Sequence, residues 1–340
     1  MPFVSCRATP GFWPGRMTFS QIKMRPVRRP CGRDPLESAT RFGHVVMLGP
    51  TNAGKSTLLN RVIGQKVSIV SPKPQTTRNS ISGILTEEGA QAVFLDTPGL
   101  HRQKRGIAPL LLRSAYAALT RADVVLVLLD GAQYARRLEG LKNDLLPIVR
   151  VLKDSPVPVV VALNKADVVR EKARMLPVLA AVGEALPGAE LFPVSALTGL
   201  GVKELLAALF ARLPEGPHQF DPDEVSTAPV RFLASEIVRE KVFLALGEEL
   251  PYSTAVTVED WDEESKPGLV KIQASILVGR ESHKPMVIGK GGERIKDIGQ
   301  KARIDIEEML GSKVFLELWV KVRPNWADDP ALLRDLGLGE

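Results

Sequence analysis

The chain has 340 residues, of which 44% are hydrophobic and 25% are charged, and its formal net charge is +6. This composition is typical of a soluble globular protein, and the length favours two domains over one. No apolar run approaches the roughly 18 residues that a membrane-spanning helix needs, which counts against an integral membrane protein.

Residues 1–41 differ in composition from the rest of the chain. They are rich in arginine and proline, show no apolar period and contain no acidic residue before Asp34, so we predict a disordered basic tail. The only two cysteines, Cys6 and Cys31, also lie here, so neither a disulfide nor a cysteine metal site is expected in the folded part. Two interpretations of the tail stay open, an organellar transit peptide and a non-functional extension upstream of the true start codon.

The strongest motif is GPTNAGKS at residues 49–56, which follows the apolar run Val45–Leu48. It has the spacing G-x-x-x-x-G-K-[ST], in which glycines let successive N–H groups converge on a phosphate. Lys55 can supply a charge for the outer phosphates, and Ser56 a hydroxyl for Mg²⁺. We therefore predict a strand, a phosphate-binding loop and a helix. The residues predicted to contact the nucleotide here are Gly49, Pro50, Thr51, Asn52, Ala53, Gly54, Lys55, Ser56 and Thr57.

The segment Val67–Thr77 is polar and interrupted by prolines, so we expect a mobile loop. Ile81–Leu85 and Ala92–Leu95 are predicted strands, and the second leads into the sequence Asp96-Thr97-Pro98-Gly99. An aspartate delivered by an apolar strand to such a turn is typical of the acid that faces Mg²⁺. The proline and glycine let the backbone leave the strand sharply beside the outer phosphate.

Continuous apolar runs at Val124–Leu129 and Val157–Leu163 indicate strands that are buried on both faces of a parallel sheet. Helical patterns and one further short strand alternate with these runs. The predicted helices are Ile107–Thr120, Leu138–Leu152, Lys172–Leu186 and Gly201–Leu213, and the short strand is Glu190–Pro193. The alternation predicts an α/β fold with a doubly wound, mostly parallel sheet and a site at the carboxyl ends of its strands.

The sequence Asn164-Lys165-Ala166-Asp167 at the end of the second run selects the nucleotide base. An aspartate here can accept hydrogen bonds from both the ring N–H and the exocyclic amine of guanine, whereas adenine would leave the carboxylate unpaired. Asn164 can connect this loop to the phosphate loop, and the stem of Lys165 can cover the base. We therefore predict binding of guanine rather than adenine nucleotides.

Residues 214–229 are rich in proline, glycine and acidic residues and are predicted to form a linker. Beyond it the patterns predict a second, small α+β domain. Its expected elements are a helix from Arg231 to about Leu246, strands Ser253–Glu259 and Val270–Val278, a helix ending near Leu310, and a last strand Val314–Val322.

A G-x-x-G loop, Gly289–Gly292, precedes the long helix of this domain. A loop without β-carbons lets the backbone approach nucleic-acid phosphates, and Lys290 and Arg294 add charge. The alternative is a tight helix start with a solvated basic face. Phe315 and Trp319 share the face of the last strand opposite its main apolar residues, where packing is favoured over base stacking. The predicted RNA-binding residues are Lys284, Ile288, Gly289, Lys290, Gly291, Gly292 and Arg294.

The set GPTNAGKS, QTTR, DTPG, NKAD and SAL resembles the motifs of translation-factor-class GTPases, and most of all those of the Era family. The sequences ASEI at 234–237 and ELPYS at 249–253 extend the resemblance, and the order of elements after the linker resembles a type II KH domain. The resemblance implies a phosphate-loop GTPase domain over 42–213, a linker over 214–229, a KH domain over 230–326 and a C-terminal tail over 327–340.

The family implies hydrolysis of GTP to GDP and phosphate with Mg²⁺. Ser56 and Thr77 would ligate the metal, Asp96 would hold it through water, and Gly99 would meet the γ-phosphate. The residues implied to bind GTP are Gly49 to Thr57, Asp96, Thr97, Pro98, Gly99, Asn164, Lys165, Asp167, Ser195 and Ala196.

No side chain in this set is assigned as an acid or base, and transition-state support would come from Lys55, Thr77 and Gly99. The residue after the DTPG turn is Leu100, which can do no acid–base chemistry, so intrinsic hydrolysis is expected to be slow. Asn52 resembles the asparagine of potassium-assisted GTPases. A K⁺ ligand and a hydrogen-bonding residue within the loop are both open interpretations of Asn52.

As partners the family implies the single-stranded 3′ end of 16S rRNA and the 30S ribosomal subunit, whose assembly the protein would assist as a cytoplasmic monomer. Peripheral contact with the inner membrane stays open, as does an organellar matrix if the tail is a transit peptide. Two alternatives remain. One is a GTPase or ATPase module whose C-terminal domain binds protein or membrane. The other is a tRNA-modification GTPase, which would need a further catalytic domain that is not visible here.

Overall fold

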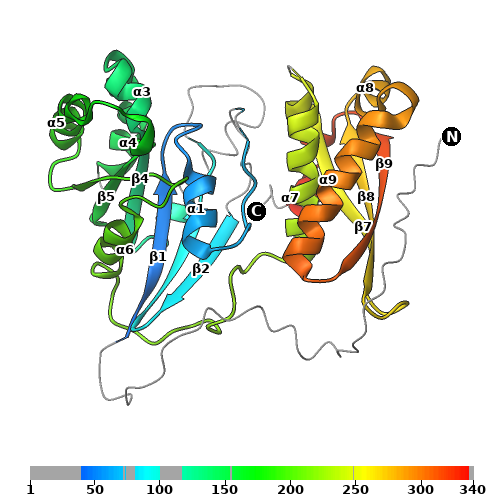
Figure 1. Ribbon diagram of the computed structural model, residues 1–340, viewed down its shortest axis with the longest axis horizontal. Helices are drawn as coiled ribbons and strands as arrows, with labels where there is room; N and C mark the ends of the chain where they lie inside the picture. The colour runs from blue at the N-terminus through cyan, green and yellow to red at the C-terminus, as the bar shows by residue number, and fades with distance from the viewer. Residues whose placement is uncertain are drawn as a thin grey trace. The chain divides into compact units, whose positions relative to one another are not determined.

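The structure is a computed structural model that describes residues 40–71, 73, 81–99, 117–153, 155–247 and 249–336 (Figure 1). The chain forms two compact units, with the boundary between Ala228 and Pro229. Nearly all of the predicted basic tail lies outside the described residues, although Arg41, at its end, already belongs to the first strand. In the described part of the chain, no helix is both long enough and apolar enough to cross a bilayer.

The first unit is built on a six-stranded sheet with the order β2-β3-β1-β4-β5-β6. Neighbouring strands are parallel except for β2 and β3, which form an antiparallel pair. The strands are β1 (Arg41–Leu48), β2 (Ile81–Glu87), β3 (Ala90–Asp96), β4 (Val124–Asp130), β5 (Val159–Asn164) and β6 (Glu190–Pro193). The predicted doubly wound, mostly parallel sheet is confirmed.

Helices cover this sheet because its central strands are apolar on both faces. Helices α4 and α5 pack against the side chains of Val46, Val125 and Val127, whereas α1 contacts β2 and β3, and α6 contacts β3 and β5. The helices are α1 (Lys55–Ile63), α3 (Gly131–Arg136), α4 (Glu139–Leu152), α5 (Leu176–Ala185) and α6 (Val202–Phe210).

Two of the predicted helices differ in extent from the helices that the structure describes. The predicted helix Lys172–Leu186 is divided into a 3₁₀ turn, Lys172–Met175, and α5. The reason is Pro177, which has no N–H and therefore suits the first turn of a new helix. Most of the predicted helix Ile107–Thr120 lies outside the described residues, and Ala117–Leu119 at its end are helical.

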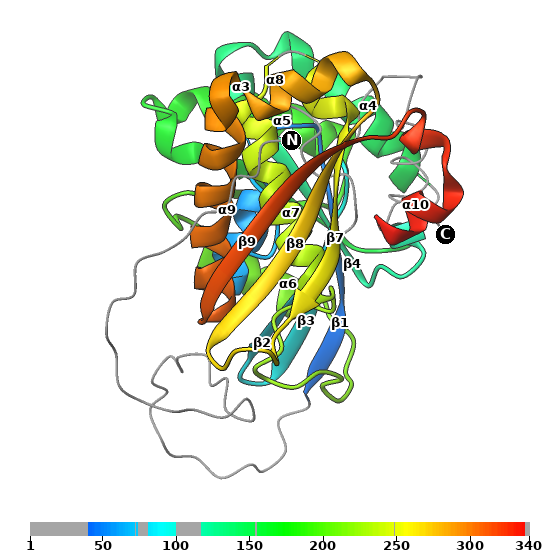
Figure 2. The ribbon, with the colours of Figure 1, turned by 90° about the vertical axis from the view of Figure 1, so that its right-hand side faces the viewer.

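The second unit has a three-stranded sheet in the order β7-β8-β9, in which β8 is antiparallel to β7 and parallel to β9 (Figure 2). Helices α7 and α9 pack on one face of it around Ile272, Ile276 and Ile298. The elements are α7 (Val230–Ala245), β7 (Thr254–Asp262), β8 (Leu269–Val278), α8 (Lys284–Ile288), α9 (Glu293–Leu310), β9 (Lys313–Val322) and α10 (Pro330–Asp335). This order confirms the predicted type II KH fold.

Two segments differ from their description as linker and tail. Residues 214–228 are hydrogen-bonded to β1, β2 and β3 and so belong to the first unit. Within 327–336 the chain forms α10, whose first turn is capped by Asp329, and the preceding Trp326 donates from Nε1 to Ser253 O at 3.0 Å. The partners of residues 214–228 and of Trp326 lie far away along the chain, so composition alone could not show this packing.

Candidate functional site

The loop between β1 and α1 lies close to the ends of β4 and β5. A Cβ on Gly49 would lie 2.2 Å from Leu128 O, and a Cβ on Gly54, whose φ is +98°, would lie 2.2 Å from Asn164 Nδ2. Only glycine fits at these two positions, because the neighbouring groups are backbone or a buried amide. The glycines therefore hold the loop in a closed curve at the carboxyl end of the sheet.

Lys55 turns back into this loop. Its Nζ donates to Gly49 O at 3.1 Å and to Pro50 O at 3.0 Å. Burial lowers the pKa of Lys55 from 10.5 to about 8, and the negative charge of Asp96 opposes this shift. A cation that has lost most of its water binds an anion more strongly than an exposed one, so the loop is prepared for phosphate.

The carboxylate of Asp96 is buried and accepts two hydroxyl hydrogen bonds. Ser56 Oγ donates to Asp96 Oδ2 at 2.6 Å, and Ser68 Oγ donates to the same oxygen at 3.0 Å. Hydroxyl and carboxylate oxygens are the hard ligands that Mg²⁺ prefers. Within the described ranges no cluster of three histidine, cysteine or acidic side chains could hold a metal. Ser56 and Asp96 supply one hydroxyl and one carboxylate oxygen, and in phosphate-loop sites the nucleotide phosphates complete the coordination of Mg²⁺.

Ser68 was not among the predicted site residues. It lies at the start of the segment expected to be a mobile loop, yet Ser68 and Ile69 are only 1% and 2% exposed. Asn60 of α1 holds this stretch by accepting from Val67 N at 3.0 Å and Ser68 N at 2.9 Å and by donating to Ser68 O at 2.7 Å. The local signal of burial is the apolar pair Val67 and Ile69 on either side of Ser68. Thr77 and Leu100 lie outside the described residues.

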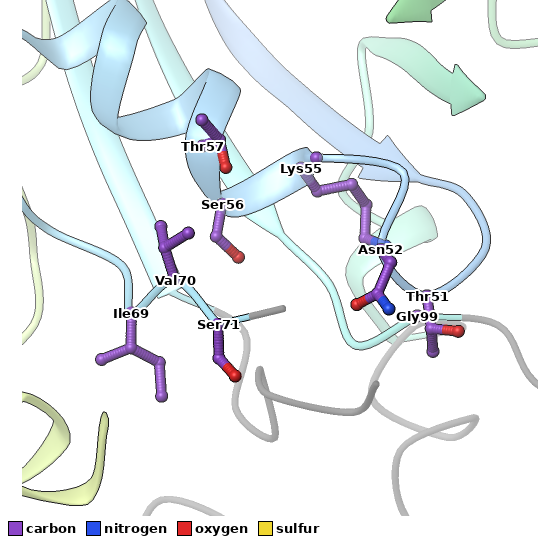
Figure 3. Close-up of a pocket in the computed structure, with 10 residues that line it drawn as sticks. Thr51, Asn52, Lys55, Ser56, Thr57, Ile69, Val70, Ser71 and Gly99 are labelled. Atoms are coloured by element: carbon purple, nitrogen blue, oxygen red, sulfur yellow. The ribbon is translucent and has the colours of Figure 1, made fainter. Parts of the chain in front are cut away.

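A pocket opens between the phosphate loop, the stretch after Ile69 and Gly99 (Figure 3). Gly99 lies against Thr51, since a Cβ on it would be 2.7 Å from Thr51 Cγ2. Asn52, at φ +62°, and Lys55 line the same pocket. The full lining is Thr51, Asn52, Gly54, Lys55, Ser56, Thr57, Ile69, Val70, Ser71 and Gly99.

Asn164 connects the two loops at the other end of the site. Its Nδ2 donates to Ala53 O at 2.8 Å, and its Oδ1 accepts from Ala196 N at 2.9 Å. The sequence predicted the first of these contacts. Arg61 of α1, which the motifs did not indicate, donates to the carbonyl oxygens of Ala196 and Leu197 and so fixes the same loop.

Of the residues expected to surround the base, Asn164, Ser195 and Ala196 are buried, whereas Lys165 is half-buried and Asp167 is exposed. Lys165, at φ +62°, pairs through Nζ with Asp130 Oδ2 at 2.6 Å, which orients its stem. Asp167 is exposed at the start of a 3₁₀ turn, and Ser195 is buried with its Oγ accepting from Thr198 N at 3.1 Å. The structure thus places Asn164, Lys165, Asp167, Ser195 and Ala196 at neighbouring strand ends.

The G-x-x-G loop of the second unit joins α8 to α9. Gly289 packs on the backbone of Arg294, since a Cβ would lie 3.0 Å from Arg294 N. Gly291 has φ +59°, and no atom lies within 4 Å of the point that a Cβ on it would occupy. Lys290 and Arg294 are exposed, and Arg294 Nη1 also donates to Met286 O. The loop backbone is therefore open to solvent between two cations.

The other predicted RNA-binding residues lie beside this loop. Ile288 packs partly on the core of the unit, and Lys284 begins α8. Phe315 and Trp319 of β9 are half-buried, so their predicted packing role is neither confirmed nor contradicted.

Two family models match the chain, one in each unit. A model described as 50S ribosome-binding GTPase matches residues 44–165, and a KH domain model matches residues 249–327. The chain is 52% identical over 300 residues to GTPase Era of Nitratidesulfovibrio vulgaris strain Miyazaki F, covering 88% of this chain and 98% of the relative. The chain belongs to the Era family of GTPases.

Other members of the Era family agree with this. GTPase Era of Sinorhizobium medicae is 46% identical over 299 residues, covering 88% of this chain and 94% of the relative. Era from Aquifex aeolicus, solved as a single-residue variant bound to GDP·AlF₄⁻, superposes with a TM-score of 0.79 at 38% identity. It is matched over 100% of its length and over 88% of this chain. Family membership makes this chain a GTPase and removes the ATPase alternative.

A second solved structure bears on the KH unit. It is a crystal structure of Era in complex with MgGDPNP and nucleotides 1506–1542 of 16S ribosomal RNA. The present chain matches it with a TM-score of 0.80 and 38% identity, over 100% of that chain and 88% of this one.

Proposed function

We propose that this Era-family GTPase binds the single-stranded 3′ end of 16S rRNA through its KH domain and acts as a GTP-dependent switch in 30S subunit assembly. The observation that carries the proposal is the solved relative bound to nucleotides 1506–1542 of 16S rRNA. This chain matches the whole length of that protein, so each of its domains has a counterpart here.

The G-x-x-G loop supplies the chemistry for RNA. Gly291 leaves an open approach to the backbone, so a phosphate can contact main-chain N–H groups without meeting a side chain. Lys290 and Arg294 contribute charge on either side, and Ile288 offers an apolar surface to an unstacked base. Lys284 extends the basic edge along α8.

In the first unit the phosphate loop binds the phosphates of GTP, and Asp167 recognises guanine. Mg²⁺ would be held by Ser56 and Asp96 together with Thr77, and when bound it neutralises charge that develops on the phosphate oxygens. Ser56 and Asp96 are already in contact at 2.6 Å, so both oxygens point to one place. Asn52 is proposed as a K⁺ ligand because its left-handed backbone presents the side chain to the pocket.

GTP would order the region around Thr77, and hydrolysis would release it, so that the affinity of the KH domain for RNA differs between the two states. The proposed division keeps the GTPase domain at 42–213 and the KH domain at 230–326, and the connection at 214–229 is the segment of which 214–228 are held along the first unit. We further propose a cytoplasmic monomer, with peripheral binding to anionic vesicles as the measurement that would reveal a membrane role.

The test uses the full chain and an RNA oligonucleotide with the sequence of the 16S 3′ end, measured with a non-hydrolysable GTP analogue and with GDP. Gly291→Asp should lower RNA affinity at least about tenfold, because it adds a negative charge at the proposed phosphate contact. Gly291→Asn is the matched control, since asparagine has the same shape and tolerates the same left-handed backbone. Equal loss in both variants, or no RNA binding by the unmodified chain, would contradict the proposal.

A further inference from the structure

The segment 214–228, here called the strap, leads from the end of the GTPase fold to Val230, the first residue of α7. It is fastened along the first unit rather than free in solvent. At its start, Phe42 N donates to Pro214 O at 3.1 Å, and Gly216 N donates to Thr40 O at 2.9 Å. Three further attachments follow, and they differ in character: the side chain of Gln91, the backbone of Ile84, whose N donates to Val225 O at 2.9 Å, and the hydroxyl groups around Ser82.

The first of these attachments is made by Gln91 of β3, whose side chain is fully buried. Its Oε1 accepts from Gln219 N at 2.8 Å and Phe220 N at 3.0 Å, while its Nε2 donates to Phe220 O and to Thr86 Oγ1, each at 2.9 Å. All the bonding capacity of this amide is therefore used. Breaking this attachment would leave buried polar groups unpaired, so it is a fixed point of the strap.

The last attachment lies at Ser82 of β2 and is made by small hydroxyl groups. Ser82 Oγ and Thr227 Oγ1 are 2.5 Å apart, Thr227 N donates to Ser82 Oγ at 3.2 Å, and Ser226 Oγ donates to Ser82 O at 2.6 Å. Thr227 is exposed, so water can replace its hydroxyl contact at little cost. This attachment, here called the clasp, is therefore far easier to open than the one at Gln91.

The clasp connects the start of β2, which lies beside the nucleotide site, with the last residues of the strap, which lead into the KH domain. Ile81, the residue before Ser82, is paired in register with Asp96, the carboxylate proposed to face Mg²⁺. On the other side, α7 begins at Val230, shortly after Thr227. A movement at the start of β2 would therefore act directly on Ser82 and, two residues on, on Ile84, and through them on the last residues of the strap.

We propose that the clasp of Ser82, Ser226 and Thr227 is the element that couples the nucleotide state to the KH domain. Its strength differs between the GTP and GDP states, which changes how tightly the start of α7 is held, while the attachment at Gln91 stays closed in both. The inference rests on the proposed function, because the coupling is measured as a difference in RNA affinity. A coupling of this kind is reciprocal, so bound RNA changes GTP affinity by the same factor.

The test variant is Thr227→Val, which keeps the shape of the side chain and removes its hydroxyl. The quantity to measure is the ratio of the RNA affinity with GTP analogue to that with GDP. In Thr227→Val this ratio should lie about three- to tenfold closer to one than in the unmodified chain, which is the range expected for loss of one hydrogen bond. Thr227→Ser should restore the ratio. Thr120→Val, which removes an exposed hydroxyl bonded to Ala117 O at 2.8 Å, is the matched control and should leave the ratio unchanged. Basal GTP hydrolysis should be unchanged in all three.

Hydrogen exchange of the full chain supplies a second readout. The amides of Val225 to Ala228 should differ in protection between GTP analogue and GDP, whereas those of Gln219 and Phe220 should not. If the unmodified chain binds RNA equally in both states, the proposed switch fails and the inference fails with it. If the unmodified chain shows a difference that Thr227→Val retains in full, or if Val225 to Ala228 are equally protected in both states, the clasp alone is refuted.

Discussion

Replacing Asn164 with alanine tests whether one buried amide holds the two ends of the nucleotide site together. The substitution removes the hydrogen bond from Nδ2 to Ala53 O, at 2.8 Å, and the one from Ala196 N to Oδ1, at 2.9 Å. Ala53 and Ala196 are 1% and 3% exposed, so neither backbone group can turn to water in place. Each unpaired buried group costs about 1–3 kcal/mol, which predicts a loss of about 2–5 kcal/mol for Asn164→Ala.

The assay has two parts. Urea unfolding of the full chain, followed by a probe in the first unit, should show the loss of stability. Binding of fluorescent GDP should weaken about five- to seventyfold if half of that loss falls on the bound conformation. Asn164→Asp separates the two bonds, because a carboxylate still accepts from Ala196 N but cannot donate to Ala53 O. Asn164→Asp should therefore weaken nucleotide binding through the phosphate loop while the loop around Ala196 stays in place.

Thr198→Ala is the control, since the Thr198 side chain is exposed and accepts one long bond, from Leu200 N at 3.4 Å. Its effect on unfolding should stay within about 0.5 kcal/mol. The reasoning is refuted if Asn164→Ala lowers stability by less than about 1 kcal/mol and leaves GDP affinity within threefold of the unmodified chain, because both buried groups would then have found other partners.

Three further predictions follow from the same site. Asp167→Asn should lower GTP affinity by at least about a hundredfold with no loss of stability, because the side chain is exposed; unchanged GTP selectivity would contradict the assignment. The pKa of Lys55 is about 8 when folded and 10.5 otherwise, so the unfolded chain binds more protons between these values. The free energy of unfolding of the nucleotide-free chain should therefore rise with pH in this window. GTP binding at pH 8.5 should take up a proton, which calorimetry in two buffers of different ionisation enthalpy measures. Lys55→Arg should show neither effect. If Asn52 ligates K⁺, hydrolysis should be faster in potassium than in sodium buffer, and equal rates would exclude that role.

The phosphate loop, the guanine motif and the G-x-x-G loop were predictable because each is a contiguous stretch whose function follows from its own backbone geometry. Gly54 shows this clearly, since the motif requires glycine and the structure shows Asn164 filling the space where a Cβ would lie. The alternation of apolar strands and helices likewise indicated the sheet, because parallel strands that are buried on both faces appear in sequence as continuous apolar runs.

Other features depended on contacts between distant parts of the chain. Ser68 joins the site only because Asn60 holds its backbone, and Gln91 fastens the strap through the main-chain groups of Gln219 and Phe220. A hydrogen bond to a backbone amide leaves almost no trace in sequence, since every residue except proline carries one. The motifs alone therefore determined which chemistry this protein can perform, whereas the tertiary structure decided how its polar connecting segments are held, because their partners are backbone groups that only folding brings within reach.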